Sequence, residues 1–174
     1  MTLLAEHRLE HPVDIALPEV WLDFDERQKR RLKTTVVVRG ESVALAIQLE
    51  RVTTPLLDGE VLGDRAGAPV VRVRAKPERL LVVSGEAFAL TRAAYHLGNR
   101  HAKVQLLDAS LRTPHDPVMA QMLVQLGLRV EEADAPFQPE VGAYHHGHSH
   151  GHGHDEHHHH GHGQPKIHRF VLKP

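Results

Sequence analysis

Histidine is the residue whose number and spacing point most directly to chemistry in this sequence. The chain has 174 residues, of which 17 are histidines. Neutral imidazole is a good ligand for the borderline divalent metals Ni, Cu, Zn and Co. Most histidine side chains are neutral at pH 7, because their unperturbed pKa is about 6.5. The composition therefore predicts a protein that binds metal ions or protons.

Most of the histidines lie in a segment that we call the tail, residues 141–174. Between Gly142 and Gly163 histidine and glycine recur with almost nothing to bury, so we expect disorder when no metal is bound. The glycines favour several weakly held, exchangeable ions over one catalytic ion, and binding should weaken at low pH because each ligand must lose its proton. The candidate ligands here are His145, His146, His148, His150, His152, His154, His157, His158, His159, His160 and His162.

Two simpler interpretations of the tail compete with a delivery role. An expression tag is usually six uninterrupted histidines, whereas this run is interrupted by glycine and lies inside the chain. The other interpretation is non-specific metal sequestration. The tail does not distinguish nickel from zinc or copper, and imidazole sites generally prefer copper to nickel. Selectivity must therefore come from geometry, metal availability or partners.

Two histidines outside the tail stand out by their position. His101 lies three residues after Gly98, where a predicted helix gives way to a strand, and His115 directly precedes a second predicted helix. A lone histidine at such a place is more often a surface or core residue than a ligand. One copy of the chain offers too few fixed imidazoles for a closed site, so two copies that meet at a symmetric interface would be an economical solution.

Several classes of protein are excluded or disfavoured by what the sequence lacks. It has no cysteine, which excludes disulfides, iron–sulfur clusters and thiolate zinc sites. With 21 basic and 22 acidic residues it is a poor candidate for binding nucleic acid. It has neither an HExxH motif nor a GxxxxGK[ST] phosphate loop, so we expect no enzyme activity. Apolar runs are too short to span a membrane and no signal peptide is evident, which predicts a cytoplasmic protein.

The first 75 residues have the patterns of β-strands. Residues 70–74 alternate Val and Arg with a period of two, as in a half-exposed strand. The charged run of residues 25–33 is typical of a solvated strand edge or turn, with a partner-docking surface as the alternative. The other predicted strands cover 20–24, 34–38 and 42–49, with turns at 39–41 and 57–61.

A different pattern begins after Lys76-Pro77. Strands are predicted at 80–83, 104–107, 110–112 and 128–131. A helix covers 87–97 and ends with Gly98 in the left-handed position. A second helix begins at Asp116-Pro117 and ends at Gly127.

This order of elements, β-α-β-β-α-β, is the ferredoxin-like order. We therefore predict an α+β protein with an N-terminal all-β domain (1–75), a ferredoxin-like metal-binding domain (76–140) and a His-rich, disordered tail (141–174).

Four segments of the sequence are similar to one known family. The run YHLGNRH at 95–101 resembles the signature of UreE, the nickel metallochaperone family of urease maturation. The segments ERQKRRL at 26–32, LDGEVL at 57–62 and PFQPE at 136–140, the last leading through Gly142-Ala143-Tyr144, also resemble UreE segments. The similarity covers nearly the whole chain, and the GNRH motif in its helical context is more specific than the His-rich tail.

The resemblance implies a nickel chaperone with a peptide-binding-like N-terminal domain and a metal-binding domain that forms a homodimer. His101 would then bind one nickel ion together with its symmetry mate, and tail histidines, including His168, would complete the ligand set. His115 matches the first histidine of the family's HDH-type segment, but Pro117 replaces the second, which should weaken an auxiliary site there.

The implied partners are the urease accessory GTPase and, through it, the apo-urease complex. Zn(II) or Cu(II) could bind in place of Ni(II). The competing interpretation is a general Ni/Zn/Cu buffer with no recipient, in which the tail would suffice and His101 would be dispensable.

Overall fold

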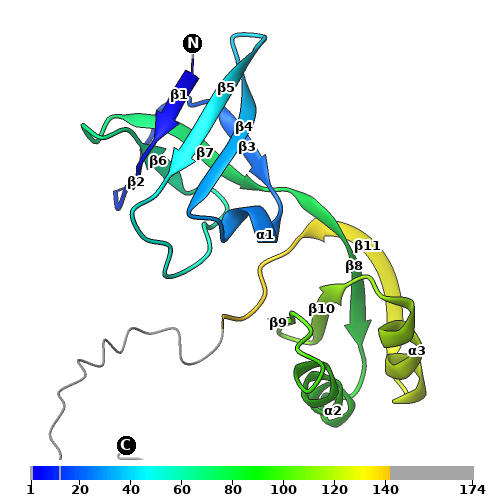
Figure 1. Cartoon of the computed structure of the whole chain (residues 1–174). Coiled ribbons are helices and arrows are strands. Elements are labelled where there is room, and N and C mark those ends of the chain that lie inside the picture. Colours follow the sequence, from blue (N-terminus) through cyan, green and yellow to red (C-terminus); the bar gives the residue numbers. More distant parts are fainter. Residues whose placement is uncertain (1, 12, 142–174) are drawn as a thin grey trace, which may run out of the picture.

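The computed structural model describes residues 2–11 and 13–141, which form two groups of elements joined at residues 75–77 (Figure 1). The first group contains two sheets and a short helix. The second contains one sheet and two longer helices. None of the helices in the described residues is long and apolar enough to cross a membrane. The protein is thus a mixed α+β chain in which strands predominate.

The N-terminal group consists of two sheets that enclose one apolar core. Their strand orders are β1-β5-β4 and β2-β6-β7-β3. Alternate residues of β7 explain the Val–Arg pattern, since Val71 and Val73 are fully buried in the core beside Leu45 and Leu62. The elements are β1 (Thr2–Ala5), β2 (His7–Arg8), β3 (Glu19–Leu22), α1 (Phe24–Arg27), β4 (Arg31–Val38), β5 (Glu41–Gln48), β6 (Val61–Gly63) and β7 (Pro69–Ala75).

The hairpin between β4 and β5 has the turn predicted from its sequence. Val38 pairs with Glu41, and the two residues between them, Arg39 and Gly40, both have positive φ, 53° and 88°. Such a turn matches the right-handed twist of the flanking strands. β4 and β5 pair along eight residues, from Arg31↔Gln48 to Val38↔Glu41. β4 is the last strand of its sheet.

The N-terminal group is not all-β as predicted, because a short helix interrupts it. Asp23 accepts a hydrogen bond from the backbone N–H of Glu26, and the side chain of Glu26 accepts one from the N–H of Asp23, which is a capping box. The predicted strand at 20–24 therefore ends at Leu22, and Phe24 begins α1. Asp23 was predicted in the strand and Glu26 in the charged run, whereas together they form the start signal of a helix.

The C-terminal group forms a four-stranded antiparallel sheet with the order β11-β8-β10-β9. Leu97 of α2 and Leu123 of α3 pack with Leu81, Val83 and Leu111 of the sheet in one apolar cluster. Its elements are β8 (Pro77–Ser84), α2 (Ala87–Gly98), β9 (Gln105–Leu107), β10 (Ser110–Pro114), α3 (Pro117–Gln125) and β11 (Arg129–Pro136). β8 and β11 are longer than predicted because they pair along eight residues each, up to Pro77↔Pro136.

The two groups meet around a buried arginine and two aromatic rings. Phe24 of α1 and Phe137, which follows β11, pack edge to face with ring centroids 5.8 Å apart. Arg27, fully buried, donates hydrogen bonds to the Phe137 carbonyl, the Gln138 side chain and the Leu56 carbonyl. Its burial lowers the pKa of the guanidinium, an effect opposed by nearby carboxylates. The prediction of a solvated run at 25–33 is therefore wrong for Arg27.

Candidate metal centre

The end of α2 places His101 in an unusual backbone conformation. The N–H of Ala102 bonds to the carbonyl of Leu97 at 3.1 Å, and the N–H of His101 bonds to that of Gly98 at 2.9 Å. These two bonds form a Schellman motif in which His101 is the residue that takes the left-handed conformation. Its φ is 54°, whereas Gly98 does not have a positive φ. The prediction that Gly98 occupies the left-handed position is therefore wrong.

The apolar spacing around the helix end explains why the motif is displaced by three residues. Leu97 is fully buried, and Ala102 packs against the same cluster. A hydrophobic contact between these two positions commonly accompanies a Schellman motif. Holding a non-glycine residue in the left-handed region costs about 1–2 kcal/mol, and such strain tends to occur at functional sites.

The side chain of His101 is exposed to solvent. Within residues 2–11 and 13–141 no three His, Asp or Glu side chains are grouped so that they could hold a metal ion. His96, one turn earlier, is half-buried and lies edge to face against Tyr95 with ring centroids 5.4 Å apart. His101 is therefore a free imidazole that needs ligands from elsewhere to form a closed site.

The start of the tail lies beside the loop that follows His101. The N–H of Glu140 donates to the carbonyl of Val104 at 2.8 Å, and the N–H of Gln138 donates to the side chain of Gln105 at 3.2 Å. Lys103 also forms an ion pair with Asp25 of α1. These contacts hold residues 138–140, which we call the root of the tail, against the loop that follows His101.

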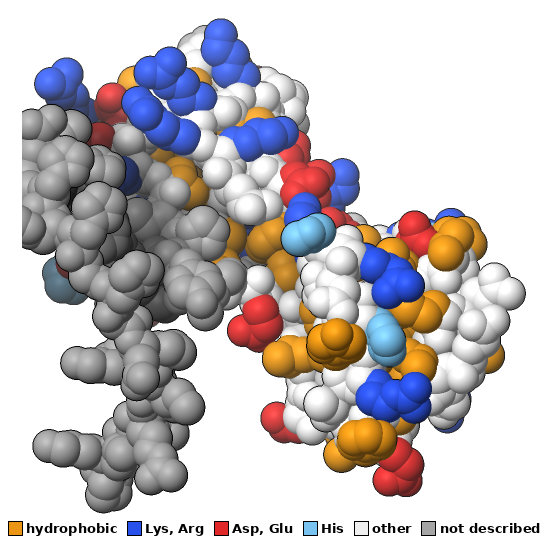
Figure 2. Space-filling model, turned by 60° about the horizontal axis from the view of Figure 1, so that its bottom comes forward, with side chains coloured by type: hydrophobic (Ala, Val, Ile, Leu, Met, Phe, Trp, Pro, Cys, Tyr) orange, Lys and Arg blue, Asp and Glu red, His pale blue; other side chains and the backbone are white. Residues whose placement is uncertain are grey.

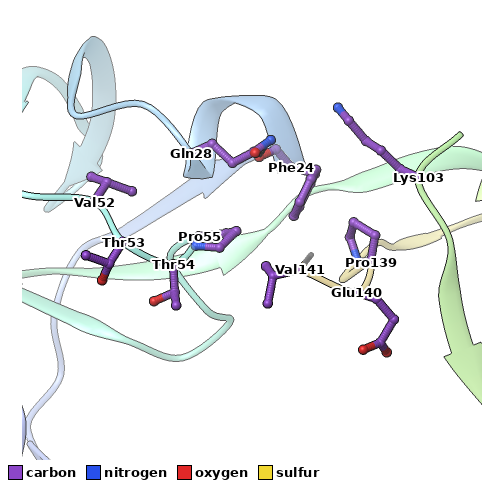
Figure 3. Close-up of a pocket in the computed structure, with 10 residues that line it drawn as sticks. All are labelled: Phe24, Gln28, Val52, Thr53, Thr54, Pro55, Lys103, Pro139, Glu140 and Val141. Atoms are coloured by element: carbon purple, nitrogen blue, oxygen red, sulfur yellow. Dashed lines mark hydrogen bonds between the residues drawn. The ribbon is translucent and has the colours of Figure 1, made fainter. Parts of the chain in front are cut away.

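Where the tail leaves the described residues, the surface has a hollow of about 230 Å³. Figure 3 shows Phe24, Gln28 and Lys103 on one side of this hollow and Pro139, Glu140 and Val141 across from them. In the sequence, His145, the first histidine of the tail, follows Val141 by four residues. The tail histidines themselves, His145 to His162 and His168, lie outside the described residues.

His115 is held differently from His101. It is half-buried before α3, and its Nε2 lies 3.1 Å from Oε1 of Glu132 on β11. Glu132 also accepts hydrogen bonds from Arg79, which together with His115 lower the pKa of the Glu132 carboxyl. Asp116 caps α3 through the N–H groups of Val118 and Met119, with Pro117 at the start of the helix as predicted. A metal bound at Nε2 of His115 would have to displace the Glu132 carboxylate.

Both histidines nevertheless lie at the same end of the C-terminal sheet. Gln105 pairs with Arg112 across the antiparallel strands β9 and β10, so the chain before β9 and the chain after β10 leave the sheet at one end. β11 also ends there, because Pro136 pairs with Pro77 and Pro114 with Leu80 at the start of β8. This end of the sheet thus gathers His101, His115 and the root of the tail.

The solvent side of α2 carries an exposed aromatic pair. Phe88 and Tyr95 are seven residues apart, which places them on one side of the helix, and they are 77% and 66% exposed. Figure 2 shows hydrophobic side chains interspersed with histidine and basic residues on this part of the molecule. Large exposed aromatic residues are typical of protein–protein interfaces.

Comparison with known proteins places residues 3–163 of the chain in one family. Models of the UreE urease accessory protein match it in two parts, the N-terminal domain over residues 3–76 and the C-terminal domain over residues 68–163. The chain belongs to the UreE family.

Relatives named urease accessory protein UreE are similar along most of their length. The UreE of Pseudomonas fluorescens (strain Pf0-1) is 47% identical over 169 residues, which cover 97% of this chain and 98% of the relative. The UreE of Azotobacter vinelandii (strain DJ) is 50% identical over 153 residues, 87% of this chain and 88% of the relative. The UreE resemblance predicted from the motifs is thereby confirmed.

Two features of this UreE chain escaped the sequence analysis. Arg27 looks like one more cation in a charged run, and no local signal marks it as buried. Gln138 and Glu140, which hold the root of the tail, lie in a proline-containing exit whose contacts involve distant residues. By contrast, the left-handed position of His101 could have been found from the Leu97–Ala102 spacing.

Proposed function

We propose that this protein is a nickel metallochaperone that captures Ni(II) and delivers it for assembly of the urease active site. The observation that carries the proposal is His101, an exposed imidazole held in a strained left-handed conformation beside the root of a histidine-rich tail. Membership of the UreE family supports nickel as the cargo and urease maturation as the role.

The proposed site forms when two copies of the chain meet. One imidazole cannot hold a metal alone, and a two-fold axis close to His101 would bring a second imidazole to the same ion. The exposed Phe88 and Tyr95 on α2 supply an apolar surface for such a homodimer. The order β11-β8-β10-β9 with its two helices supports the assignment of residues 76–140 to a ferredoxin-like metal-binding domain, and of 1–75 to the separate β-rich domain.

The tail would load this site and hand the ion onward. Because its root is bonded next to the loop that carries His101, the histidines of the tail would raise the local concentration of imidazole around the interface. A nickel ion could then move stepwise from one ligand to the next. Its release would stay fast, because no set of ligands would have to enclose it completely. His168 and any of the tail histidines could complete the ligand set, and Zn(II) or Cu(II) could compete for it.

The proposed recipients are the urease accessory GTPase and the apo-urease complex, in the cytoplasm. The protein itself would act as a carrier and not as an enzyme. We assign His115 a secondary role, because its Nε2 is engaged by Glu132 and Pro117 replaces a second histidine. The alternative function, a metal buffer without a recipient, is favoured only by the abundance of histidines in the tail.

Nickel titration calorimetry combined with light scattering tests the proposal. Four proteins are compared: the full chain, a chain that ends at Tyr144, His101→Ala and the control His7→Ala, which removes an exposed histidine of β2. We expect the chain that ends at Tyr144 to bind about one nickel ion per dimer. Among the four proteins, only His101→Ala should lose this tight binding event. If shortening abolishes all binding while His101→Ala binds like the full chain, the protein is a tail-based buffer.

A further inference from the structure

One residue at the root of the tail is hydrogen-bonded to both groups of elements. The side-chain oxygen of Gln138 accepts a hydrogen bond from Nη1 of Arg27, which lies in α1 of the N-terminal group. The backbone N–H of Gln138 donates to the side-chain oxygen of Gln105 at 3.2 Å, and Gln105 begins β9 of the C-terminal group. Gln138 therefore links a buried guanidinium to the strand that follows the His101 loop.

The residues on either side of Gln138 are fixed as well. Phe137 and Pro139 are buried, and the N–H of Glu140 donates to the carbonyl of Val104 at 2.8 Å. Figure 3 shows Pro139 and Glu140 on one wall of the hollow at the root. Because four successive residues are each buried or bonded, the tail starts from one defined place on the protein.

Arg27 acts on this path from inside the N-terminal group. Its side chain is fully buried, so it does not reach the surface where a metal could bind. It donates hydrogen bonds to the carbonyls of Leu56 and Phe137 and to the side chain of Gln138. A buried charge that loses its hydrogen-bond partners is costly, so Arg27 favours the conformation in which residues 137 and 138 stay in place. Any influence of Arg27 on the nickel site would pass through the root of the tail.

The chain between the root and the first tail histidine is short. His145 follows Glu140 by five residues, whereas it follows Pro136, the end of β11, by nine. The effective concentration of a tethered group falls roughly as the −3/2 power of the length of its tether. Release of the root would therefore lower the local concentration of the first tail imidazoles about two- to threefold.

We propose that Gln138 is a positioning residue for nickel handling, which makes the tail begin beside the loop that follows His101. Through Arg27, the N-terminal group then takes part in loading a site on the C-terminal group without supplying a ligand. The inference rests on the proposed function, because it concerns the same His101 site, and it adds the residues that bring the tail to that site.

Paramagnetic broadening of NMR signals tests the positioning on the metal-free full chain. The sequence has no cysteine, so Ala143→Cys gives a single attachment site for a nitroxide label. We expect the label to broaden the amide signals of residues 104 and 105, and this broadening to fall at least about twofold in Gln105→Ala and in Gln138→Ala. Gln105→Ala leaves every acceptor of Arg27 in place, so it decides the test if Gln138→Ala fails to fold.

Two further variants are controls for the same measurement. Gln138→Glu keeps an oxygen acceptor for Arg27 and should show the broadening of the unchanged chain. Gln121→Ala removes an exposed glutamine of α3 and should show it too. Broadening that persists in both Gln105→Ala and Gln138→Ala overturns the proposal, and so does an equal loss in Gln121→Ala.

Nickel titration of Gln105→Ala in two chain lengths separates a positioning role from a structural one. In the full chain we expect the affinity of the tight nickel site to fall about twofold. In the chain that ends at Tyr144 the affinity should not change, because the tail histidines are absent. An equal fall in both lengths, or no fall in either, overturns the proposal. If the unsubstituted chain that ends at Tyr144 lacks the tight site, the proposed function fails instead, and the label still decides whether Gln138 positions the root.

Discussion

The two long helices of the C-terminal group end in the same backbone motif but with different residues. At the end of α3 the N–H of Leu128 bonds to the carbonyl of Leu123, and Gly127 takes the left-handed position with a φ of 83°. At the end of α2 the equivalent bonds are made by Ala102 and Leu97, and His101 takes that position with a φ of 54°. Glycine adopts this conformation without strain, whereas histidine does so at a cost.

The difference separates a residue that serves the fold from one that serves chemistry. Gly127 is the residue that a helix end prefers, and the motif needs nothing more from it. Glycine would fit this motif better than His101 does. Under the proposed function the imidazole is there for its lone pair, and the Schellman motif leaves its side chain exposed to solvent. Five variants test this difference between the two helix ends.

We expect the largest effect at Arg27, which joins the two groups of elements close to the loop that follows His101 and not at the end of α3 that carries Gly127. Arg27→Met keeps the side-chain volume but leaves the buried carbonyls of Leu56 and Phe137 without a donor. We expect a loss of about 3 kcal/mol in the free energy of unfolding, measured by urea denaturation. The control Arg31→Met removes an exposed cation and should change stability by less than about 0.5 kcal/mol. Equal effects would contradict the buried role of Arg27.

His101→Gly should separate function from stability at the helix end itself. Removal of a ligand should lower the affinity of the tight nickel site at least about 100-fold, because even the loss of groups that support a metal ligand lowers metal affinity about 10–100-fold. The free energy of unfolding should rise by about 1 kcal/mol, because glycine relieves the left-handed strain. Calorimetry and urea denaturation on the same protein measure both. A fall in stability would show that His101 helps to hold the fold.

Gly127→Ala is the reciprocal test on α3. A Cβ at Gly127 would meet no atom within 4 Å, so any cost arises from the backbone conformation alone. We expect the free energy of unfolding to fall by about 1 kcal/mol, with nickel binding unchanged. If Gly127→Ala altered the nickel titration, the two helix ends would not be independent.

The smallest effect concerns the ion pairs that Glu132 makes with Arg79 and His115. Because Arg79 and His115 lower the pKa of Glu132 in the folded protein, the unfolded state binds the proton more tightly. Their stabilisation is present above the unfolded-state pKa of about 4.5 and is lost as the pH falls through the lower folded-state value. We expect Arg79→Met to flatten the dependence of stability on pH in this acidic range. In parallel, His115→Ala should change nickel binding less than His101→Ala, and the reverse order would contradict the assignment.

Local signals in the sequence predicted the fold where a motif is complete within a few residues. The Val–Arg alternation of β7, the turn at Arg39-Gly40 and the start of α3 at Asp116-Pro117 are all found where the sequence places them. Each of these depends on contacts between neighbours in the chain or on one buried face.

The sequence was misleading where distant contacts decide the outcome. Arg27 is buried because Phe137 and Gln138, more than one hundred residues away, provide its acceptors. Gly98 is a helical residue because the Leu97–Ala102 bond places the left-handed residue three positions later, at His101. For the candidate site, the importance of His101 was predicted from its motif, but its conformation and the adjacent root of the tail became apparent only in three dimensions.

The central claim, that nickel reaches its recipient through His101, is tested most directly by activating urease in a purified mixture. The nickel-loaded full chain is compared with nickel-loaded His101→Gly, which keeps the helix end and all the histidines of the tail. We predict that the full chain activates urease and that His101→Gly, although it still carries nickel on its tail, does not activate it above the level of free nickel at the same concentration. Activation by His101→Gly equal to that of the full chain would contradict the account and identify the tail alone as the source of the metal.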